Sequence, residues 1–342
     1  MKAVRIHEFG PEEVLLYEEA PNPVPTDGEA LVRVVAAALN HVDLDVRAGT
    51  SRMRLDLPAI LGLEFAGEVA ALPPSAGTDI AEGDPVAVTY TIPCRACGYC
   101  RTGRDNVCSH RQLFGVTRPG GYAEFVAAPI GALIPLPDGF SPVAAAASQV
   151  AFSTAWHVLI TRARLRTAQT VLIHAAGSGI GSAALQVASV AGARIIATAS
   201  DSEKLTRALR FADEGIDYTD PQWPQHVLDL TEGRGVDVVM SHVGGDEYAG
   251  SMEVVKADGV VVIVGAHGGE VVPLDLVSFF RREVRQIGSS RATRSEIEHV
   301  LGLAARGVFE PQIHRTYPLE EAATAHRDLA SRGVSGKLIL EV

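Results

Sequence analysis

Short apolar runs followed by turn-forming residues characterise the amino-terminal part of the chain. Residues 30–37, 65–70 and 85–88 are rich in Val and Ala, and the segments 73–77 and 82–84 contain Pro, Gly and Asp. Runs of this length bounded by such residues are typical of β-strands joined by turns. We therefore expect this part of the chain to be rich in β-structure.

From about residue 151 the pattern changes to short apolar strands that alternate with helices. This alternation implies a parallel sheet whose helices connect its strands by right-handed crossovers. After about residue 288 the chain ends in two helices and one more strand, and no internal repeat is visible. The pattern predicts strands at 170–174, 193–198, 236–240, 259–264 and 337–340, and helices at 182–191, 202–211, 294–305 and 319–330.

The composition favours a soluble protein of two domains. The 342 residues are 47% hydrophobic, and this length suits two domains of ordinary size. With 30 basic and 41 acidic residues, the net charge of −11 disfavours nucleic acid or an anionic membrane as the main partner. We expect no apolar run long enough to span a bilayer and no signal peptide. The expected location is the cytoplasm.

All four cysteines lie in one short window, at Cys94, Cys97, Cys100 and Cys108. Cysteines with two residues between them can direct their sulfurs to one centre, and four thiolates suit a tetrahedral Zn²⁺. Four sulfurs also complete the tetrahedron and leave no position for a substrate. We predict one structural zinc in a surface lobe at residues 92–110. A reactive cysteine cluster and an iron–sulfur site are the alternatives.

A glycine-rich segment follows the first strand of the alternating region and opens its first helix. Small residues there let a pyrophosphate approach the backbone, where the free N–H groups of the helix N-terminus meet its charge. The alternative is an ordinary strand–helix turn. The predicted phosphate loop consists of Ala176, Gly177, Ser178, Gly179, Ile180 and Gly181.

The end of the second strand of this region favours NADPH over NADH. An NAD site usually places an acidic residue about 20 residues after the loop, where it holds the ribose 2′-hydroxyl. Here the strand ends in small neutral residues, and Ser200 and Lys204 are in place to contact a 2′-phosphate, with Tyr218 nearby. Asp201 comes slightly late for that acidic residue and is the argument for NADH.

Together these features resemble the medium-chain dehydrogenase/reductase superfamily, which includes zinc alcohol dehydrogenases and quinone oxidoreductases. The resemblance covers nearly the whole chain. Besides the cysteine lobe and the phosphate loop, it rests on GLEFAGEV at 62–69, GGYAEF at 120–125, STAW at 153–156 and the pair Gly244-Gly245.

The resemblance implies an α/β protein with two domains. Residues 1–150 and 289–342 would form a catalytic domain, which is a GroES-like, partly open β-barrel that carries the zinc lobe. Residues 151–288 would form an inserted Rossmann domain, which is a doubly wound parallel sheet that binds the dinucleotide. The active site would lie in the cleft, and a homodimer is expected, with a tetramer as the alternative.

The sequence departs from the alcohol dehydrogenases of this superfamily at their catalytic zinc. Those enzymes bind it with an early Cys, the His of a Gly-His-Glu motif, and a Cys before the Ser-Thr segment. By resemblance, Asn40, Leu63 and Val150 take these positions here. All four cysteines belong to the lobe, and neither Leu nor Val can bind a metal, so we predict no catalytic zinc.

Without a Lewis acid an alcohol is difficult to oxidise, whereas an electron-poor acceptor needs less help. The first hypothesis is therefore hydride transfer from NADPH to a quinone or an α,β-unsaturated carbonyl. The second is an alcohol dehydrogenase or carbonyl reductase, with an atypical metal site of His41, Asp43 and Glu64 or with a proton relay. A non-catalytic NADPH-binding protein and a redox switch acting through the cysteine lobe are further alternatives.

The candidate catalytic residues are Asn40, His41 and Thr154. Asn40 would hydrogen-bond a substrate carbonyl, and His41 would donate or relay the proton that follows the hydride. The alternative for His41 is a partly buried loop histidine without a catalytic role. By resemblance, Thr154 packs against the nicotinamide ring, and Gly265 allows close approach of the cofactor. Lys337 lies either near the cleft or on the surface.

Overall fold

The structure is a computed structural model that describes residues 1–74, 77–331 and 333–342. The chain divides into two compact units. The sequence suggested boundaries after residues 150 and 288, and the described units change after residues 150 and 292. Ser75 and Ala76, from the expected turn at 73–77, lie outside the described residues. Unit 1 comprises Met1–Val150 and Thr293–Val342, and unit 2 comprises Ala151–Ala292.

Unit 1 is built around strand β3 (Glu29–Ala38), which pairs with three other strands. These partners are β5 (Glu64–Ala71), β9 (Phe125–Pro129) and β18 (Lys337–Glu341), and each of them runs antiparallel to β3. The sheet has the order β10-β6-β5-β3-β18-β17, and it confirms the expected GroES-like barrel. The other strands of unit 1 are β1 (Lys2–Ile6), β2 (Leu16–Glu19), β4 (Ala59–Ile60), β6 (Pro85–Val88), β7 (Thr91–Ile92), β8 (Gln112–Leu113), β10 (Leu133–Pro135) and β17 (Ile313–Pro318).

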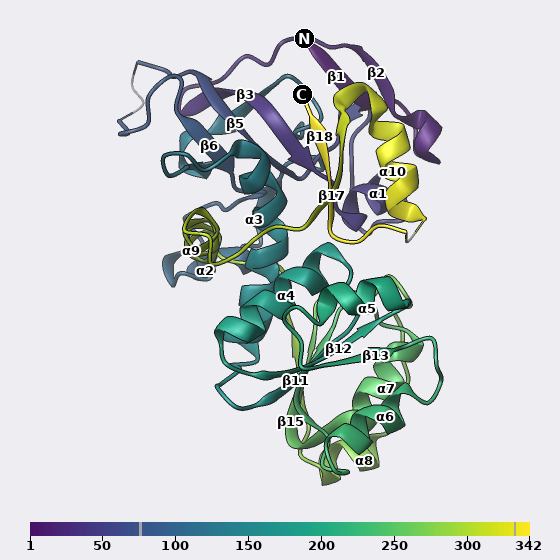
Figure 1. Ribbon diagram of the computed structural model, residues 1–342. Helices are drawn as coiled ribbons and strands as arrows, with labels where there is room; N and C mark the ends of the chain where they lie inside the picture. The colour runs from purple at the N-terminus through teal and green to yellow at the C-terminus, as the bar shows by residue number, and fades with distance from the viewer. Residues whose placement is uncertain (75–76, 332) are drawn as a thin grey trace. The chain divides into compact units, whose positions relative to one another are not determined.

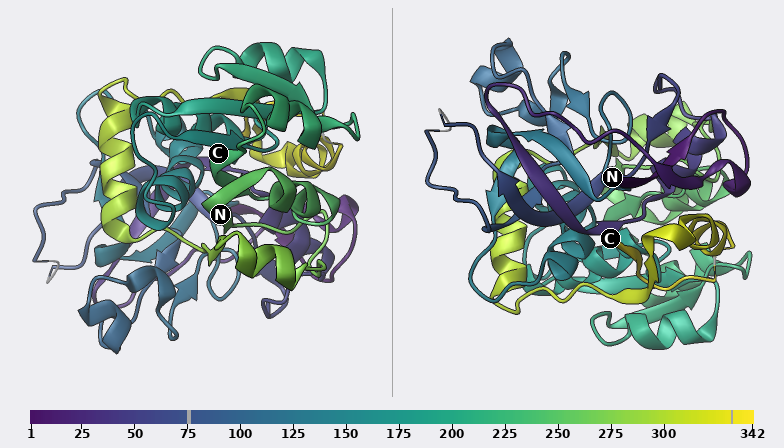
Figure 2. Two further views of the ribbon diagram at one scale, coloured as in Figure 1. Left: turned by 90° about the horizontal axis from the view of Figure 1, so that it is seen from below. Right: turned by 90° about the horizontal axis from the view of Figure 1, so that it is seen from above.

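The register of the central strands brings distant parts of the chain together. Ala38 on β3 lies opposite Ile339 on β18 and opposite Glu64 on β5. Two residues further along β18, Lys337 therefore lies near the end of β3, close to Asn40. Both chain ends belong to this unit and lie near each other in both views of Figure 2.

One long, mostly apolar helix begins in unit 1 and continues past Val150 into unit 2. Helix α3 (Pro142–Trp156) continues into a π-helical turn, His157–Arg162, and together they are long and apolar enough to cross a membrane. The expectation that no such segment exists is wrong by length and composition. However, 78% of its apolar window is buried, as in the core helix of a soluble protein. The other helices of unit 1 are α1 (His41–Ala48), α2 (Gly98–Arg101), α9 (Arg294–Ala305) and α10 (Ala322–Ala330).

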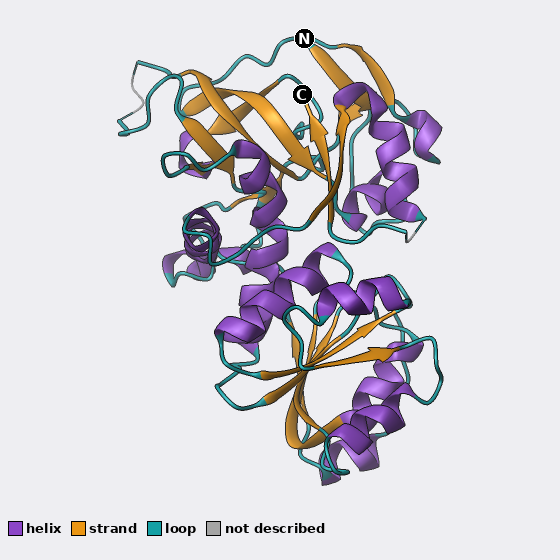
Figure 3. Ribbon diagram, in the orientation of Figure 1, coloured by secondary structure: helices purple, strands orange, loops and turns teal. Residues whose placement is uncertain are grey.

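Unit 2 is a parallel six-stranded sheet of order β13-β12-β11-β14-β15-β16. Helices α4 and α5 cover one face, and α6, α7 and α8 cover the other (Figure 1); Figure 3 shows the strands in orange between them. This is the expected Rossmann fold. Its strands are β11 (Thr170–Ile173), β12 (Arg194–Ala199), β13 (Glu214–Asp217), β14 (Val236–Ser241), β15 (Val255–Ile263) and β16 (Arg285–Gly288), and its helices are α4 (Gly179–Val190), α5 (Ser202–Ala208), α6 (Trp223–Leu230), α7 (Asp246–Val254) and α8 (Leu276–Arg281).

Several element boundaries differ from the sequence prediction by a few residues, and three of these differences have a local cause. Helix α4 begins at Gly179 and not at 182, because Ser178 caps it and the glycines form its first turn. Strand β15 begins at Val255 and not at 259, because polar residues near its start hide the apolar pattern. The helix expected from 319 begins as a 3₁₀ turn, Leu319–Glu321, before α10.

Candidate active site and metal centre

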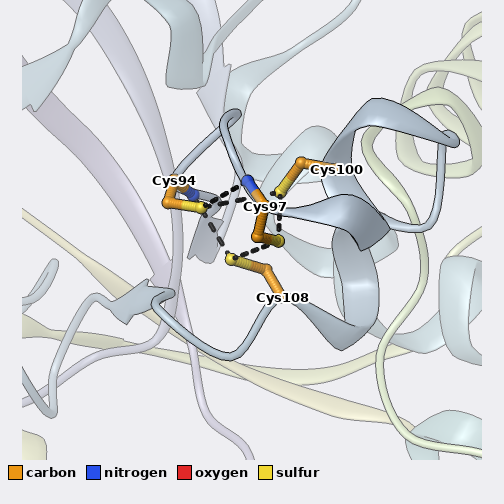
Figure 4. Close-up of side chains that lie close together, drawn as sticks. All are labelled: Cys94, Cys97, Cys100 and Cys108. Carbon is orange, nitrogen blue, oxygen red and sulfur yellow. Dashed lines mark hydrogen bonds between the residues drawn. The ribbon is translucent and has the colours of Figure 1, made fainter.

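The four cysteines of the lobe point their sulfur atoms at one another (Figure 4). The Sγ atoms of Cys97 and Cys100 are 3.5 Å apart, those of Cys97 and Cys108 are 3.9 Å apart, and those of Cys94 and Cys100 are 4.0 Å apart. Zinc–sulfur bonds of about 2.3 Å imply sulfurs separated by about 3.8 Å in a regular tetrahedron. The lobe therefore has the geometry of a structural Zn²⁺ site.

The backbone around the lobe also stabilises thiolates. The amides of Ala96 and Cys97 donate to the Cys94 sulfur and lower the pKa of this thiol to about 6. A metal binds the thiolate form, so groups that favour this form help the residues to hold zinc. Among the described residues, these cysteines are the only group of three or more His, Cys, Asp or Glu side chains placed to hold one ion.

We predict one zinc ion per chain, bound by four sulfurs. Metal analysis of the purified protein is expected to give a stoichiometry close to one, and X-ray absorption should show a shell of sulfur at about 2.3 Å. Cys108→Ser is the variant that tests the site. Cys108 is fully buried, and its loss should reduce the zinc content. A zinc content of two in the wild-type protein would contradict the prediction.

A buried row of polar side chains lies where β18, β3 and β5 end side by side. The ammonium of Lys337 donates to Glu64 Oε2 at 2.8 Å, to Asn40 Oδ1 at 2.9 Å and to the carbonyl of Leu39 at 2.8 Å. The Lys337 side chain is 7% exposed and the Glu64 side chain is fully buried. All three ammonium hydrogens have acceptors, so Lys337 is a core residue of unit 1 and not a surface lysine.

Asn40 and Asp43 extend this row into helix α1. Asn40 is the N-cap residue, and its backbone N–H donates to Asp43 Oδ2 at 2.8 Å, while Leu63 N–H donates to the other oxygen at 3.3 Å. Burial raises the pKa of Asp43 to about 6, and the hydrogen bond from Asn40 and the charge of Lys337 oppose this rise. The start of α1 is thus tied to strand β5.

Of the three positions that the resemblance assigns to zinc ligands, Asn40 and Val150 contact Glu64, and Leu63 is its neighbour in the chain. The amide of Asn40 donates to Glu64 Oε2 at 3.0 Å, and the backbone N–H of Val150 donates to Oε1. Leu63 precedes Glu64 in the chain and is buried. The side chains at these positions offer no thiolate or imidazole, and the positive charge beside Glu64 is that of Lys337.

The alternative metal site does not form among the described residues, because His41, Asp43 and Glu64 are not gathered around one point. His41 is the first residue of α1 and is exposed. Thr154 lies in α3 and is buried. The catalytic roles of Asn40, His41 and Thr154 remain predictions.

The predicted phosphate loop has the local structure that a diphosphate needs. Ser178 accepts the N–H of Gly181 at 3.0 Å and caps α4, and the amide of Ala176 is tied to Thr198 of β12. A side chain on Gly181 would lie 2.3 Å from the carbonyl oxygen of Ala175, so only glycine lets α4 approach β11 this closely. The helix N-terminus therefore faces the carboxyl edge of the sheet.

The residues proposed for the 2′-phosphate lie beside this loop. The Lys204 ammonium is 3.2 Å from Ser200 Oγ and 2.9 Å from Asp201 Oδ2, and its stem passes over Gly177. The backbone N–H of Tyr218 donates to Ala199 at the end of β12. The sequence therefore identified a cluster that the fold brings together, although Asp201 already pairs with Lys204.

Gly265 follows β15 on the same edge. A side chain at Gly265 would lie 2.5 Å from the backbone oxygen of His242, which follows β14. The sequence prediction named Gly265 but missed His242 and the groups around it. A signal was present, since polar residues follow the apolar strands at both His174 and Ser241-His242.

A buried polar group lies behind this edge. His174 Nε2 is 3.0 Å from Glu247 Oε1 and 3.0 Å from Ser251 Oγ, and Nδ1 is 3.1 Å from Thr198 Oγ1. Burial raises the pKa of Glu247 to about 8 and lowers the pKa of His174 to about 3. At neutral pH the contact is therefore a hydrogen bond between two uncharged groups and not an ion pair.

Glu247→Gln is expected to remove a pH dependence of stability. Because folding raises the pKa of Glu247, its contribution is fully present below the unfolded pKa of about 4 and is lost as the pH rises through about 8. Unfolding by urea should show the wild-type protein losing stability, relative to the variant, as the pH rises from about 4 to about 8, with little further loss above that range. Parallel curves for the two proteins would mean that Glu247 is not held protonated.

Comparison with known proteins places the chain in a family. The profile of the alcohol dehydrogenase GroES-like domain matches residues 26–138, and the zinc-binding dehydrogenase profile matches residues 179–306. An NAD-dependent alcohol dehydrogenase of Sulfolobus acidocaldarius is 32% identical, over 100% of both chains. The chain belongs to the medium-chain dehydrogenase/reductase superfamily. It is therefore an oxidoreductase, as the resemblance implied.

Relatives within the medium-chain dehydrogenase/reductase superfamily are named either quinone oxidoreductases or alcohol dehydrogenases. A quinone oxidoreductase of Sus scrofa is 28% identical, over 99% of this chain and 97% of the relative. A solved structure described as an NAD-dependent alcohol dehydrogenase is 39% identical, covers 100% of both chains and superposes with a TM-score of 0.96. The names divide between the two leading hypotheses, so the reaction has to be argued from the residues.

Proposed function

We propose that this protein transfers hydride from NADPH to a quinone or an α,β-unsaturated carbonyl without a catalytic metal. The observation that carries the proposal is the row Lys337–Glu64–Asn40. Glu64 contacts two of the positions that by resemblance would carry zinc ligands, and it is already paired with a lysine ammonium at 2.8 Å. A divalent cation at the same place would meet this positive charge and the side chains of Leu63 and Val150, which offer no ligand atom.

The acceptor class follows from the chemistry that remains. The dinucleotide supplies the hydride when it is bound, and the chain supplies orientation and protons. Oxidation of an alcohol needs stabilisation of an alkoxide, for which the proposed site offers no Lewis acid. A quinone or an enone accepts hydride readily because its ring or double bond is already electron-poor.

His41 is the proposed proton donor, because it is exposed at the start of α1, one residue from the buried row. Asn40 is the proposed partner of the substrate carbonyl. Its two amide hydrogens are donated to Glu64 at 3.0 Å and to the carbonyl of Ala38 at 3.2 Å. To bind a substrate carbonyl, Asn40 would therefore give up the longer of these bonds, the one to Ala38, and donate that hydrogen to the substrate.

NADPH is the proposed cofactor because β12 ends in the small, neutral Ala199 and Ser200, with Lys204 beside them. A 2′-phosphate would take over the Lys204 ammonium from Asp201. Lys204→Ala should then weaken NADPH binding about tenfold and leave NADH binding nearly unchanged, which is the effect of about one lost charge-assisted hydrogen bond. Arg207→Ala, whose side chain pairs with Glu203 on the outside of α5, is the matched control.

One experiment tests the reaction. Protein of measured zinc content is mixed with NADPH or NADH and a panel of quinones, enones, aldehydes and ketones, and oxidation of the dinucleotide is followed. The proposal expects fastest turnover of quinones or enones with NADPH and one zinc per chain. Absence of turnover with every acceptor would contradict it, as would activity that is restored only by adding a second equivalent of zinc.

An NAD-dependent alcohol dehydrogenase is the second candidate. The Asp201 carboxylate, 2.9 Å from the Lys204 ammonium, favours it because this acidic group could hold a ribose hydroxyl instead. The names of two close relatives also favour it. Reduction of NAD⁺ by a small alcohol at a higher rate than oxidation of NADPH by any quinone would establish this candidate.

We also propose that the protein is a cytoplasmic homodimer. Strand β16 is an edge of the sheet of unit 2 as described, and helix α8 exposes apolar side chains at Leu276, Val277 and Phe280. An edge strand in the same unit as an exposed apolar helix is the kind of surface that a second copy can cover. Sedimentation analysis is expected to give twice the mass of 36.1 kDa.

A further inference from the structure

The carboxyl ends of β11 and β14 place titratable groups next to the phosphate loop. His242 follows β14, and its Nε2 atom lies 3.2 Å from Oγ of Ser178. The same Oγ accepts the N–H of Gly181 and caps α4. An imidazole is thus joined by a single hydroxyl to the first turn of the helix that would receive a diphosphate.

This imidazole also lies at the point where the strand order of the sheet reverses. The chain progresses from β11 to β12 and β13 on one side, and from β14 to β15 and β16 on the other. Ligands of such sheets bind in the crevice outside the carboxyl ends of the strands, at this reversal. Ser178 follows β11 and His242 follows β14, so they lie on the two sides of this reversal, and both are only partly buried.

The titratable groups near His242 bring little net charge to this corner of unit 2 at neutral pH. His174 at the end of β11 has its pKa lowered to about 3, and Glu247 on α7 has its pKa raised to about 8, so both are uncharged near neutral pH. Across the loop, the charge of Lys204 on α5 is paired with Asp201. A diphosphate bound on the phosphate loop would therefore carry more negative charge than any of the side chains around His242.

We propose that His242 binds the diphosphate of the dinucleotide and takes up a proton from solvent as it does so. The imidazolium then donates a charge-assisted hydrogen bond to a phosphate oxygen, next to the bonds that α4 donates from its backbone. This inference rests on the proposed function, since it requires a dinucleotide on the loop. The alternative is a purely structural role, in which His242 only fixes the hydroxyl of Ser178.

Proton uptake separates these two roles, because a structural hydrogen bond does not change protonation when the ligand binds. Binding of NADH is measured by titration calorimetry at pH 7 in two buffers of different ionisation enthalpy. NADH is used first, because the 2′-phosphate of NADPH titrates near pH 6 and would add its own proton. The wild-type protein is expected to take up a fraction of one proton per dinucleotide, and its affinity should fall by up to about tenfold between pH 6 and pH 8.

His242→Asn and His242→Gln keep a polar side chain but cannot titrate. Both are expected to bind without proton uptake and to change affinity by less than about twofold over the same pH range. His226→Asn, an exposed histidine on α6, is the matched control and should behave as the wild-type protein does. Glu247→Gln should keep the pH dependence below pH 7, because that carboxyl is already protonated there.

The outcomes distinguish this inference from the proposed function. Failure of the wild-type protein to bind either dinucleotide overturns both. Binding without proton uptake by the wild-type protein overturns the inference alone, whatever the variants do. Proton uptake that persists in a folded His242→Asn protein also overturns it, and thermal melting of each variant establishes that it is folded.

Discussion

Lys337→Met is expected to lower the free energy of unfolding by about 3–5 kcal/mol, the usual cost of removing one partner of a buried ion pair. The variant leaves the carboxylate of Glu64 in the core of unit 1, where the amide of Asn40 and the N–H of Val150 still donate to it. It also leaves the carbonyl of Leu39 without the ammonium at 2.8 Å. Methionine nearly preserves the length of the stem, so the loss reports mainly on charge. Urea unfolding of the two proteins gives the difference.

Two further variants show whether the effect comes from the buried charge. Lys256→Met removes a lysine whose side chain is 40% exposed and pairs with Asp237, and it should cost less than about 1 kcal/mol. The double variant Lys337→Met/Glu64→Gln removes both charges and should regain part of the lost stability. If Lys337→Met costs no more than Lys256→Met, the row does not hold unit 1 together as described.

The buried row could not be predicted from the sequence, although each of its members was noticed there. Lys337 follows a Gly and begins an apolar strand, which is equally compatible with a surface position. What buries it is the pairing of β18 with β3, which joins residues separated by 297 positions in the chain. A local pattern carries no information on this register, because it depends on which strands the whole barrel brings together.

The cysteine lobe and the phosphate loop were predictable because their geometry is local. Four thiols within one short segment can meet only at one centre, and the spacing alone suggests a tetrahedral site. A strand, a glycine-rich turn and a helix likewise form one unit, and Ser178 caps α4 within it. His242 was missed for the opposite reason, since it lies 64 positions from Ser178 and meets it only through the order of the sheet.

Each unit contains one buried pair of titratable side chains, and the two pairs differ in charge. In unit 1 the buried Lys337–Glu64 pair holds a cation beside Asn40, and the proposed reaction would use this region to orient a substrate and not to activate an alcohol. In unit 2 His174 and Glu247 are held uncharged behind the sheet edge, so the local charge there can follow the ligand. If the protein works as proposed, it depends on tight placement of its dinucleotide, and the glycine loop is the segment proposed to provide that placement.

Gly181→Ala is therefore expected to raise the dissociation constant of the dinucleotide by at least about tenfold, since about 1.4 kcal/mol suffices for this factor. The added methyl group would lie 2.3 Å from the carbonyl oxygen of Ala175 and 2.9 Å from the Cα atom of Ala176. Both contacts are with backbone, so α4 or the loop has to move. The N–H groups of the first turn then no longer face the diphosphate as a set. Fluorescence titration with NADPH and NADH measures the change.

Gly302→Ala is the control for the substitution itself. Gly302 lies within α9, and a side chain there meets nothing within 4 Å, so alanine should leave binding unchanged and stabilise the helix by up to about 1 kcal/mol. Gly181→Ala should in contrast destabilise unit 2 by about 1–3 kcal/mol, as overpacking does. Unchanged affinity in a folded Gly181→Ala protein would mean that the dinucleotide does not bind on this helix, because a diphosphate cannot use N–H groups that the methyl group has displaced.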